Sequence, residues 1–494
     1  MSAHLQRALD AIEEREAKLL VWGDTEVGFS REELEDMISP LLDIEDPSES
    51  TVVDELEDHA MIYETTQSNE DGDPLFRSRM AESVRLYSNL RQWFHGQAIE
   101  KSKTLVSDFR FMRKPRHYPA RDQDLSRVLS LWTKRGLVND LKKKALQVLI
   151  GEYQMAGFQV RATERILMGI PDPNISFKNN LKSASSTIIC AGTGSGKTNA
   201  FFWPALSYVA DDVVKNPGSR VRVVALYPRN ELLKDQFNEA WYQCRKLDGL
   251  MTSEGGRKLK IGALFGDTFR DINDAKYQAQ KDNKLFHNFS LLKCGNGPCS
   301  GELRWNKVDF DKNIELLRCS LCDTKVGSDE VSLTRDTMAT DAPDIIFTTT
   351  EMLNQRMGDP KLRVLFGIIR GKQNVPLVLL DEVHTYSGTT GANVALLLRR
   401  WRRLAGRYPH FAGLSATLTG AEKFFSQLTG IKEERTQLIE PSSEEMVEEG
   451  SEYMLALRGD AVSKTALLST TIQATILASR LQDNSVGSSA ISKG

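Results

Sequence analysis

One stretch decides the fold of this chain: Ala191-Gly192-Thr193-Gly194-Ser195-Gly196-Lys197-Thr198. This pattern is typical of a phosphate-binding loop, because the glycines let backbone N–H groups turn inward around an anion. Lys197 can reach the β- and γ-phosphates of a nucleotide, and Thr198 can place its hydroxyl on Mg²⁺. A helix should begin at the loop, so that its positive end also faces the phosphates. The predicted nucleotide-binding residues here are Gly192, Thr193, Gly194, Ser195, Gly196, Lys197 and Thr198.

A second segment supplies two carboxylates. Val378-Leu379-Leu380 is an apolar run typical of a buried parallel strand, and Asp381-Glu382-Val383-His384 follows it directly. Asp381 is predicted to hold Mg²⁺ through water, and Glu382 to orient or deprotonate the attacking water. The two segments together predict a site that hydrolyses a nucleoside triphosphate. Its predicted catalytic residues are Lys197, Asp381, Glu382 and His384.

A third segment, Ser415-Ala416-Thr417, follows the first two along the chain. In this order the three segments resemble motifs I, II and III of the first motor domain of superfamily 2 helicases of the DEAD/DEAH-box type. The resemblance implies an ATP-dependent helicase, and therefore an ATP hydrolase. It implies an α/β fold with a RecA-like, mostly parallel sheet. It also implies that Ser415, Ala416 and Thr417 couple the ATP site to movement along a nucleic acid.

Three strand ends between motifs I and II are candidates for contact with a nucleic acid. Val221 to Leu226 is a strand followed by Tyr227 to Gln236, which resembles motif Ia of the same family, and Asp344 to Leu353 resembles motif Ib. A further strand, Ile261 to Phe265, ends at Gly266. Helix N-termini, hydroxyls and basic side chains at such junctions suit phosphates, although each is also an ordinary junction of an α/β domain. The predicted residues are Arg229, Asn230, Gly266, Thr349 and Thr350.

Two further features resemble particular helicases. Gly157-Phe158-Gln159 is similar to the element whose glutamine reads the adenine edge, which implies a role for Gln159 in ATP binding. The H-x-Y-x-G-x-x-G pattern from His384 and the Gly266-Asp267-Thr268 element are similar to the MrfA/YprA-type branch of bacterial DNA helicases. Related large helicases occur in phage-defence and DNA-modification clusters of the DISARM and Dpd types. This branch implies DNA as the nucleic-acid partner.

Four of the six cysteines form two pairs, Cys294-x₄-Cys299 and Cys319-x₂-Cys322. Two such pairs can converge on one tetrahedral ion, and residues 301–305 and 315–318 between them have strand-like patterns. We predict a zinc ribbon with structural Zn²⁺; unligated thiols and an iron–sulfur cluster are the alternatives. The MrfA branch has its cysteines at the C-terminus, so this insertion departs from it. The predicted metal ligands are Cys294, Cys299, Cys319 and Cys322.

The length and composition of the chain limit how many domains it can contain and what kind of protein it can be. The chain has 494 residues, enough for roughly two to four domains, and a net charge of −3, so nucleic-acid binding requires local basic patches. No transmembrane run or signal peptide is visible, and the cysteine pattern is that of a reduced protein, so a cytoplasmic location without a membrane partner is expected. The predicted domains are a helical, partly acidic accessory region (1–150), a RecA-like ATP-binding domain (151–435), an inserted zinc ribbon (290–326), and a linker with the start of a truncated second RecA-like domain (436–494).

Three segments of the accessory region carry more specific predictions. Ser30 and Glu33 predict a capping box that opens a helix reaching about Leu42. Residues 44–75 carry many acids, which favours a solvated face or a linker. Residues 110–121 mix Arg and Lys with aromatics, which suits either a grip on nucleic acid or a charged surface loop.

The sequence thus predicts the ATP-binding half of an ATP-dependent superfamily 2 DNA helicase or translocase that uses ATP, Mg²⁺ and structural Zn²⁺. Only residues 418–494 follow the third motif. We therefore expect the second RecA-like domain, which supplies the arginine finger, to lie on a second chain or to have been lost by truncation. The alternatives are a non-catalytic, nucleotide-switched scaffold subunit of a nucleic-acid-associated complex, and an RNA helicase.

Overall fold

The computed structural model describes residues 2–92, 96, 98, 102–171, 184–368, 375–406, 408–416, 418–459 and 464–482. The chain forms two compact units, one made by residues 118–447 and the other by residues 1–117 together with 448–494. Within the described ranges, no helix is both long and apolar enough to cross a membrane.

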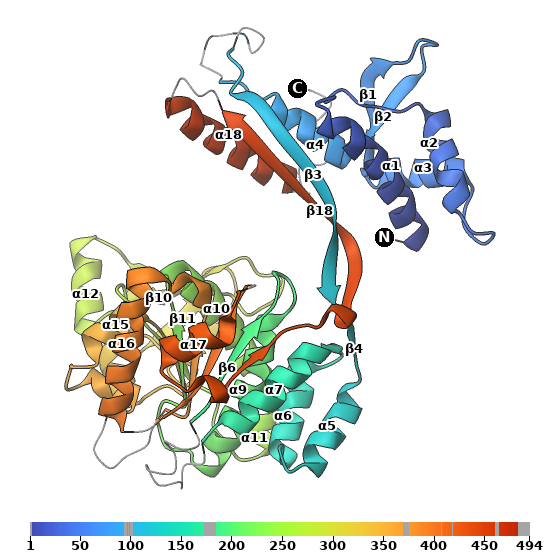
Figure 1. The fold of residues 1–494 in the computed structure, drawn as a ribbon. Helices are drawn as coiled ribbons and strands as arrows, with labels where there is room; N and C mark the ends of the chain where they lie inside the picture. The colour runs from blue at the N-terminus through green and yellow to red at the C-terminus, as the bar shows by residue number, and fades with distance from the viewer. Residues whose placement is uncertain are drawn as a thin grey trace. The chain divides into compact units, whose positions relative to one another are not determined.

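An eight-stranded parallel sheet forms the centre of the unit 118–447 (Figure 1). The predicted α/β fold with a RecA-like sheet is confirmed. The strands in spatial order are β13 (Val331–Ser332), β8 (Ile261–Leu264), β14 (Ile345–Thr349), β7 (Val223–Tyr227), β15 (Leu377–Leu380), β16 (His410–Ser415), β6 (Ser186–Cys190) and β17 (Thr436–Ile439).

Both faces of this sheet are buried, which explains why its strands are nearly continuous apolar runs. In β7, Val223 and Ala225 belong to one hydrophobic cluster, and Val224 and Leu226 belong to the other, because successive side chains point to opposite faces. The first cluster includes residues of α5 (Leu125–Lys134), α6 (Asp140–Ile150), α7 (Gly157–Gly169), α9 (Lys197–Lys215), α10 (Asn230–Lys246), α11 (Asp248–Ser253) and α12 (Ile272–Lys281). The second includes residues of α14 (Arg335–Thr340), α15 (Thr350–Arg356), α16 (Gly388–Ala405) and α17 (Ala421–Thr429).

A buried ion network holds the amino ends of β7 and β14. Asp344 is fully buried and accepts hydrogen bonds from Arg222 Nη1 at 2.6 Å and Arg257 Nη1 at 2.7 Å. It also accepts one from the backbone N–H of Lys260 at 2.9 Å. Arg222 reaches Asp212 as well, at 2.6 Å. A buried charge is tolerated only when it is paired and hydrogen-bonded, so this network fixes the start of two central strands.

A second sheet, antiparallel and four-stranded, is inserted in the chain between β8 and β13. The strand predictions for 301–305 and 315–318 are confirmed by its two middle strands. Phe289 packs edge-on against Phe237 of α10, with ring centroids 6.4 Å apart, so the inserted sheet is anchored on that helix. The order of the sheet is β12 (Lys325–Gly327), β11 (Leu316–Cys319), β10 (Glu302–Asn306) and β9 (Phe286–Lys293), and α13 (Lys307–Asp311) follows β10 in the chain.

The other unit combines helices with two pairs of strands. The predicted capping box is confirmed: Ser30 Oγ accepts a hydrogen bond from the Glu33 N–H, and Glu33 Oε2 accepts one from the Ser30 N–H at 2.8 Å. Its elements are α1 (Ala3–Val21), α2 (Arg31–Ile38), α3 (Glu49–Asp58), the antiparallel pair β1 (Ile62–Ser68) and β2 (Pro74–Ser78), α4 (Arg79–Ser88), the paired strands β3 (Val106–Pro119) and β18 (Met446–Gly459), and α18 (Lys464–Gln482).

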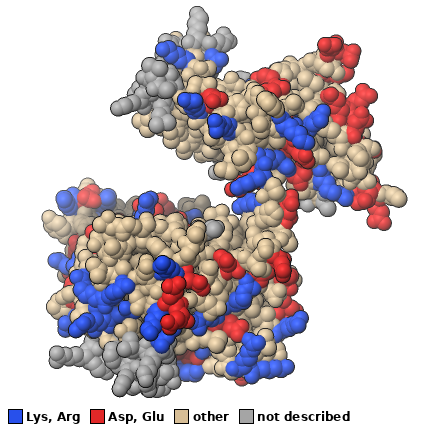
Figure 2. All heavy atoms as spheres, in the orientation of Figure 1, with Lys and Arg blue, Asp and Glu red and all other residues tan. Residues whose placement is uncertain are grey.

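The linker interpretation of residues 44–75 is wrong. This segment contains α3 and β1, and Val52, Val53 and Leu56 are fully buried in the core of their unit. The apolar residues of α3 are spaced by about one helical turn, so one face of the helix packs inward while its acids face solvent. Figure 2 shows Asp and Glu side chains gathered at the turn between β1 and β2.

The charged-loop interpretation of residues 110–121 is also wrong, because β3 covers most of this segment. Phe111 is buried in the core of its unit. Arg113 reaches Asp10 at 2.6 Å, and Lys114 reaches Glu452 at 3.1 Å. Two of the basic side chains are therefore already paired with carboxylates, which weakens the alternative that this segment grips nucleic acid.

Candidate active site and metal centre

The phosphate-binding loop joins β6 to α9, and the helix begins at Lys197 as predicted. Gly196 has a φ of +81°, and a Cβ atom there would lie 2.6 Å from Gln159 Nε2, so only glycine fits this position. Ser195 Oγ donates to the Gly192 carbonyl at 2.7 Å, and Lys197 Nζ donates to the Ala191 carbonyl at 3.4 Å. Gly192, Thr193 and Gly194 are exposed, while Thr198 lies half-buried in the first turn of α9. The loop therefore has a defined shape with an accessible tip.

Gln159 is fully buried beside this loop. Its Nε2 donates to the Gly196 carbonyl at 3.0 Å, and its Oε1 accepts from the Ala156 N–H at 2.9 Å. Both polar groups of the amide thus contact the backbone, and Gln159 supports the phosphate loop. Its predicted contact with adenine stays a prediction.

Asp381 lies directly after β15 and is 6% exposed. Its Oδ1 accepts a hydrogen bond from the Glu382 N–H at 2.8 Å. Burial raises the pKa of Asp381 to about 6, and the charges of Lys197 and His384 act in the opposite direction. A cation near this carboxylate stabilises its ionised form, which is the form that holds Mg²⁺.

The three motifs meet through Ser415, the last residue of β16, which lies between β15 and β6 in the sheet. Ser415 Oγ lies 3.4 Å from His384 Nδ1, and the Ser415 carbonyl accepts from the Ala191 N–H at 3.3 Å. His384 Nδ1 also lies 3.3 Å from Glu382 Oε2. Ala416 follows half-buried, and Thr417 lies outside the described residues. A displacement of Ser415 would therefore shift the phosphate loop through Ala191 and the Glu382 carboxylate through His384.

Glu382 has a φ of +46°, in the left-handed region that residues other than glycine rarely adopt. Such a backbone costs on the order of 1–3 kcal/mol and persists where the surrounding structure holds it. Here it turns the chain sharply after Asp381. The two neighbouring carboxylates can thus serve different roles.

The predicted nucleic-acid-binding residues lie at the carboxyl ends of β7, β14 and β8, which are neighbours in the sheet. Arg229 is exposed before α10, and its side chain makes no hydrogen bond or ion pair with the described residues. Asn230 begins that helix, and Gly266 is exposed after β8. Thr349 Oγ1 accepts from the Met352 N–H at 3.2 Å and caps α15, which begins at Thr350. Their contact with nucleic acid stays a prediction.

Basic side chains also gather locally on this unit, although the net charge of the whole chain is −3. Figure 2 shows Lys and Arg side chains over α16. Arg399, Arg400 and Arg403 are exposed there. This patch lies outside the residues that the sequence predicted.

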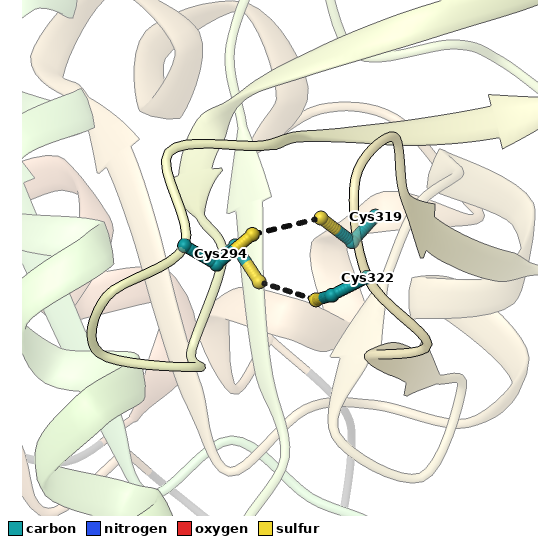
Figure 3. Close-up of side chains that lie close together, drawn as sticks. Cys294, Cys319 and Cys322 are labelled. Carbon is teal, nitrogen blue, oxygen red and sulfur yellow. Dashed lines mark hydrogen bonds between the residues drawn. The ribbon is translucent and has the colours of Figure 1, made fainter.

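The four clustered cysteines converge at one end of the inserted sheet (Figure 3). Cys294 Sγ lies 3.4 Å from Cys322 Sγ, and Cys299 Sγ lies 3.6 Å from Cys319 Sγ; all four sulfurs lie within 4.8 Å of one another. A tetrahedral Zn²⁺ with bonds of about 2.3 Å places its sulfurs about 3.8 Å apart, so the arrangement fits that ion. Hydrogen bonds from Thr324 lower the pKa of Cys322, whereas Cys299, despite its hydrogen bond from Gly301, has its pKa raised by burial and by contacts with the other cysteines. Cys322 is therefore the readier of the two to form the thiolate that a metal needs.

The DEAD/DEAH box helicase family model matches residues 175–270 and 307–424. The chain contains a DEAD/DEAH box helicase domain. This confirms the resemblance that the three motifs indicated. The residues between the two matched segments, 271–306, contain β9, β10 and the first cysteine pair, so they lie outside what the family model describes.

Relatives of the helicase domain are found among curated proteins and solved structures. Druantia protein DruE of Escherichia coli (strain UMEA 4076-1) is 28% identical over 261 residues, which cover 44% of this chain and 14% of DruE. YprA of Bacillus subtilis (strain 168), an uncharacterized ATP-dependent helicase, is 38% identical over 61 residues, 12% of this chain and 8% of YprA. A crystal structure of the DUF1998 helicase MrfA bound to DNA aligns at 18% identity over 71% of this chain and 34% of MrfA, with a TM-score of 0.39. The matches thus span only a small part of either curated relative.

Two buried tyrosines of the helicase domain were not among the site residues predicted from sequence. Tyr227 and Tyr386 are buried, and neither hydroxyl has a hydrogen-bond partner among the described residues. Burial raises the pKa of both phenols, and the charge of Asp381 adds to the effect. The two rings therefore form part of the buried surroundings of Asp381. Tyr386 belongs to the H-x-Y pattern, which was the available signal.

Gly301 was missed at the cysteine site. A Cβ atom there would lie 2.3 Å from Cys319 Sγ and 3.2 Å from Cys299 Sγ. The Gly301 N–H donates to Cys299 Sγ at 3.4 Å. Glycine is required here because two cysteine sulfurs approach the backbone closely.

Proposed function

We propose that this chain is the ATP-binding part of an ATP-dependent superfamily 2 helicase or translocase that acts on single-stranded nucleic acid, DNA in the first place. The observation that carries the proposal is the contact of Ser415 with both the phosphate loop and His384. This contact gives motif III a physical link to the two motifs that handle the nucleotide. A role in a phage-defence or DNA-modification system, which the sequence resemblance implies, is part of the proposal.

Each side chain of the ATP site has a distinct role in this proposal. Lys197 leaves the Ala191 carbonyl to bind the β- and γ-phosphates, and Thr198 and Asp381 hold Mg²⁺. Glu382 positions the attacking water, and His384 holds the carboxylate of Glu382 by its contact at 3.3 Å. When bound there, Mg²⁺ would supply positive charge beside the phosphates.

The nucleic-acid strand runs along the carboxyl ends of β7, β14 and β8 in this proposal. Arg229 is free to meet a phosphate, and the positive end of α10 begins beside it. Such contacts carry no base information, so affinity should be independent of sequence and should fall with salt, with a slope of roughly −0.7 per neutralised phosphate.

The proposal is tested by measuring ATP binding by calorimetry and phosphate release with and without single-stranded DNA. Lys197→Ala should abolish ATP binding, because the cation that faces the phosphates is lost. Glu382→Gln should keep ATP binding and lower turnover by roughly 10²–10⁴-fold, the usual contribution of a positioned acid or base. Lys215→Ala is the matched control, because Lys215 is an exposed lysine at the other end of α9, where its ion pair with Asp211 is far from the phosphate loop.

ATP binding that survives Lys197→Ala would contradict the assigned site. A rate of phosphate release that neither DNA nor RNA strands change would contradict the helicase function and favour a nucleotide-switched scaffold. Stimulation by RNA alone would replace DNA by RNA as the partner.

A further inference from the structure

A cavity of about 650 Å³ lies between the edge of the parallel sheet and the inserted sheet. One wall is formed by the turn after β8, including Gly266 and Phe269, and by Ser332 of β13. The opposite wall is β9 from Phe286 to Leu291. The cavity thus exists because the inserted sheet stands beside the parallel one.

Several aromatic rings line this cavity beside its polar groups. The ring of Phe269 lies 4.8 Å from His287 and 6.0 Å from Trp305, centroid to centroid. The Phe286 ring has the guanidinium of Arg304 at 4.2 Å from its centroid, so its π-system already accepts a cationic neighbour. Aromatic side chains of this kind stack flat, delocalised rings such as nucleobases.

Polar groups in the cavity lack partners. Ser332 is 1% exposed, and its hydroxyl has no hydrogen-bond partner among the described residues. Arg335 Nε is buried and unpartnered in the same way, while Arg335 Nη2 donates to the Gly266 carbonyl at 3.0 Å. Asn288 and Ser290 are exposed on β9, and their side chains make no hydrogen bond with described residues. Buried polar groups of native proteins are nearly always satisfied, so a ligand or water with donors and acceptors belongs here.

The charges of the lining argue against a phosphate in the cavity. Asp267 and Asp274 both line it and would repel an anion. Lys284 is paired with Asp282 at 2.9 Å, and Arg335 is turned to backbone carbonyls. A neutral aromatic ring with polar edges fits these walls, and Asp267 can accept hydrogen bonds from its amino groups.

The cavity also lies on the proposed path of the strand. Its wall contains Gly266 at the carboxyl end of β8, next to β14, where Thr349 and Thr350 are located. We propose that this cavity takes up one unstacked nucleobase of the bound strand. The inference rests on the proposed function, because it takes the bound strand as given and adds that one of its bases enters the cavity.

The test compares the affinity for an intact single strand with that for a strand of equal length containing abasic residues, by fluorescence anisotropy. Wild-type protein should bind the intact strand about tenfold more tightly, within the range measured for one stacked base. Phe286→Ala removes a stacking wall, and Ser290→Trp fills the cavity from an exposed position; both should lose this preference. A ribonucleotide strand measured in parallel tells whether the base comes from DNA or RNA.

Two controls separate this inference from the proposed function. Tyr277→Ala removes an exposed ring of α12 next to Gln278 but outside the cavity lining, and it should keep the preference. Arg229→Ala should weaken both strands equally, because it removes a phosphate contact. If Phe286→Ala and Ser290→Trp keep the wild-type ratio, or wild-type protein binds both strands equally, the cavity proposal is overturned while the strand path stands. Wild-type protein that binds neither strand would overturn both.

Discussion

The ATP site and the cysteine site lie in the same unit, but different forces hold them. The phosphate loop and Asp381 follow β6 and β15, strands that are buried on both faces of a large sheet. The cysteines lie at the turns of short strands, and Cys299, Cys319 and Cys322 are only partly buried. Packing therefore sets the ATP site before any ligand arrives, whereas the four sulfurs need an ion to balance their crowded charges. The contrast predicts different responses to loss of metal, loss of a buried charge and change of pH.

The largest expected effect is that of metal removal. Wild-type protein should contain a single Zn²⁺, and binding free energies of structural zinc reach about 10–16 kcal/mol in small domains. A chelator should raise hydrogen exchange across residues 286–327 and leave β7 and β15 protected, with ATP binding retained. Elemental analysis and exchange mass spectrometry check both statements. Iron in place of zinc, or hydrogen exchange that rises equally in both sheets, would contradict the view that zinc holds only the cysteine site and packing holds the ATP site.

A pair of glycine variants sharpens that experiment. Gly301→Ala places a methyl group against two cysteine sulfurs, so it should reduce the zinc content of the purified protein. Gly297→Ala lies in the same cysteine turn with nothing within 4 Å of its added Cβ, and it should keep the metal. Equal zinc contents in the two variants would show that the close approach at Gly301 is tolerated.

A smaller effect is expected from the ion network under the parallel sheet. Asp344→Ala leaves Arg222 buried without a carboxylate at its Nη1 atom, so the unfolding free energy should fall by about 3–5 kcal/mol. Urea unfolding followed by circular dichroism measures the loss. Asp329→Ala is the control, because its ion pair with Lys258 is exposed and worth about 0–1 kcal/mol. A similar small loss for both variants would mean that core packing alone holds these strands.

The smallest effect concerns pH. Because burial raises the pKa of Asp381 from 3.8 to about 6, its contribution to stability is fully present below pH 3.8 and is lost as pH rises through 6. Between pH 5 and pH 8 this loss is about 1 kcal/mol. Asp381→Asn should remove it, so the variant should gain stability relative to wild type as pH rises. Unfolding curves of both proteins at the two pH values give the difference, and parallel pH profiles would refute a raised pKa.

The parts of the site that were predicted from sequence are those whose chemistry is local. The glycines and lysine of 191–198, the carboxylates after an apolar run and the paired cysteines each have a spacing that their ligand dictates. The order of the eight strands has no such signal, because it depends on how the chain crosses between strands. The pairing of β3 with β18 joins segments that lie at opposite ends of the sequence, which no local pattern records.

Contacts that depend on the third dimension were missed for the same reason. The amide of Gln159 spans from Ala156 to Gly196, and the sequence alone gave the residue only its family role. Nothing in the sequence marks Gly301 as special. Glycine is needed there because the sulfur of Cys319, from the second cysteine pair, lies against its backbone. The many acids of 44–75 suggested an exposed segment, although the spacing of Val52 and Leu56 is that of a helix with one buried face.

One helix joins the cysteine site to the carboxyl end of β7. α10 begins beside Arg229, and farther along it carries the inserted sheet: Phe237 packs on Phe289, Asn238 Oδ1 accepts from the Lys293 N–H at 2.9 Å, and Tyr242 donates to the Cys294 carbonyl at 2.8 Å. A helix is stiff along its axis, so it transmits force as a rod does. A load applied to the inserted sheet is therefore delivered to the start of α10, where the proposed strand path runs, and a load applied at the start of α10 is delivered to the cysteine site. In mechanical terms, a partner that pulls on the inserted sheet also pulls on the start of α10.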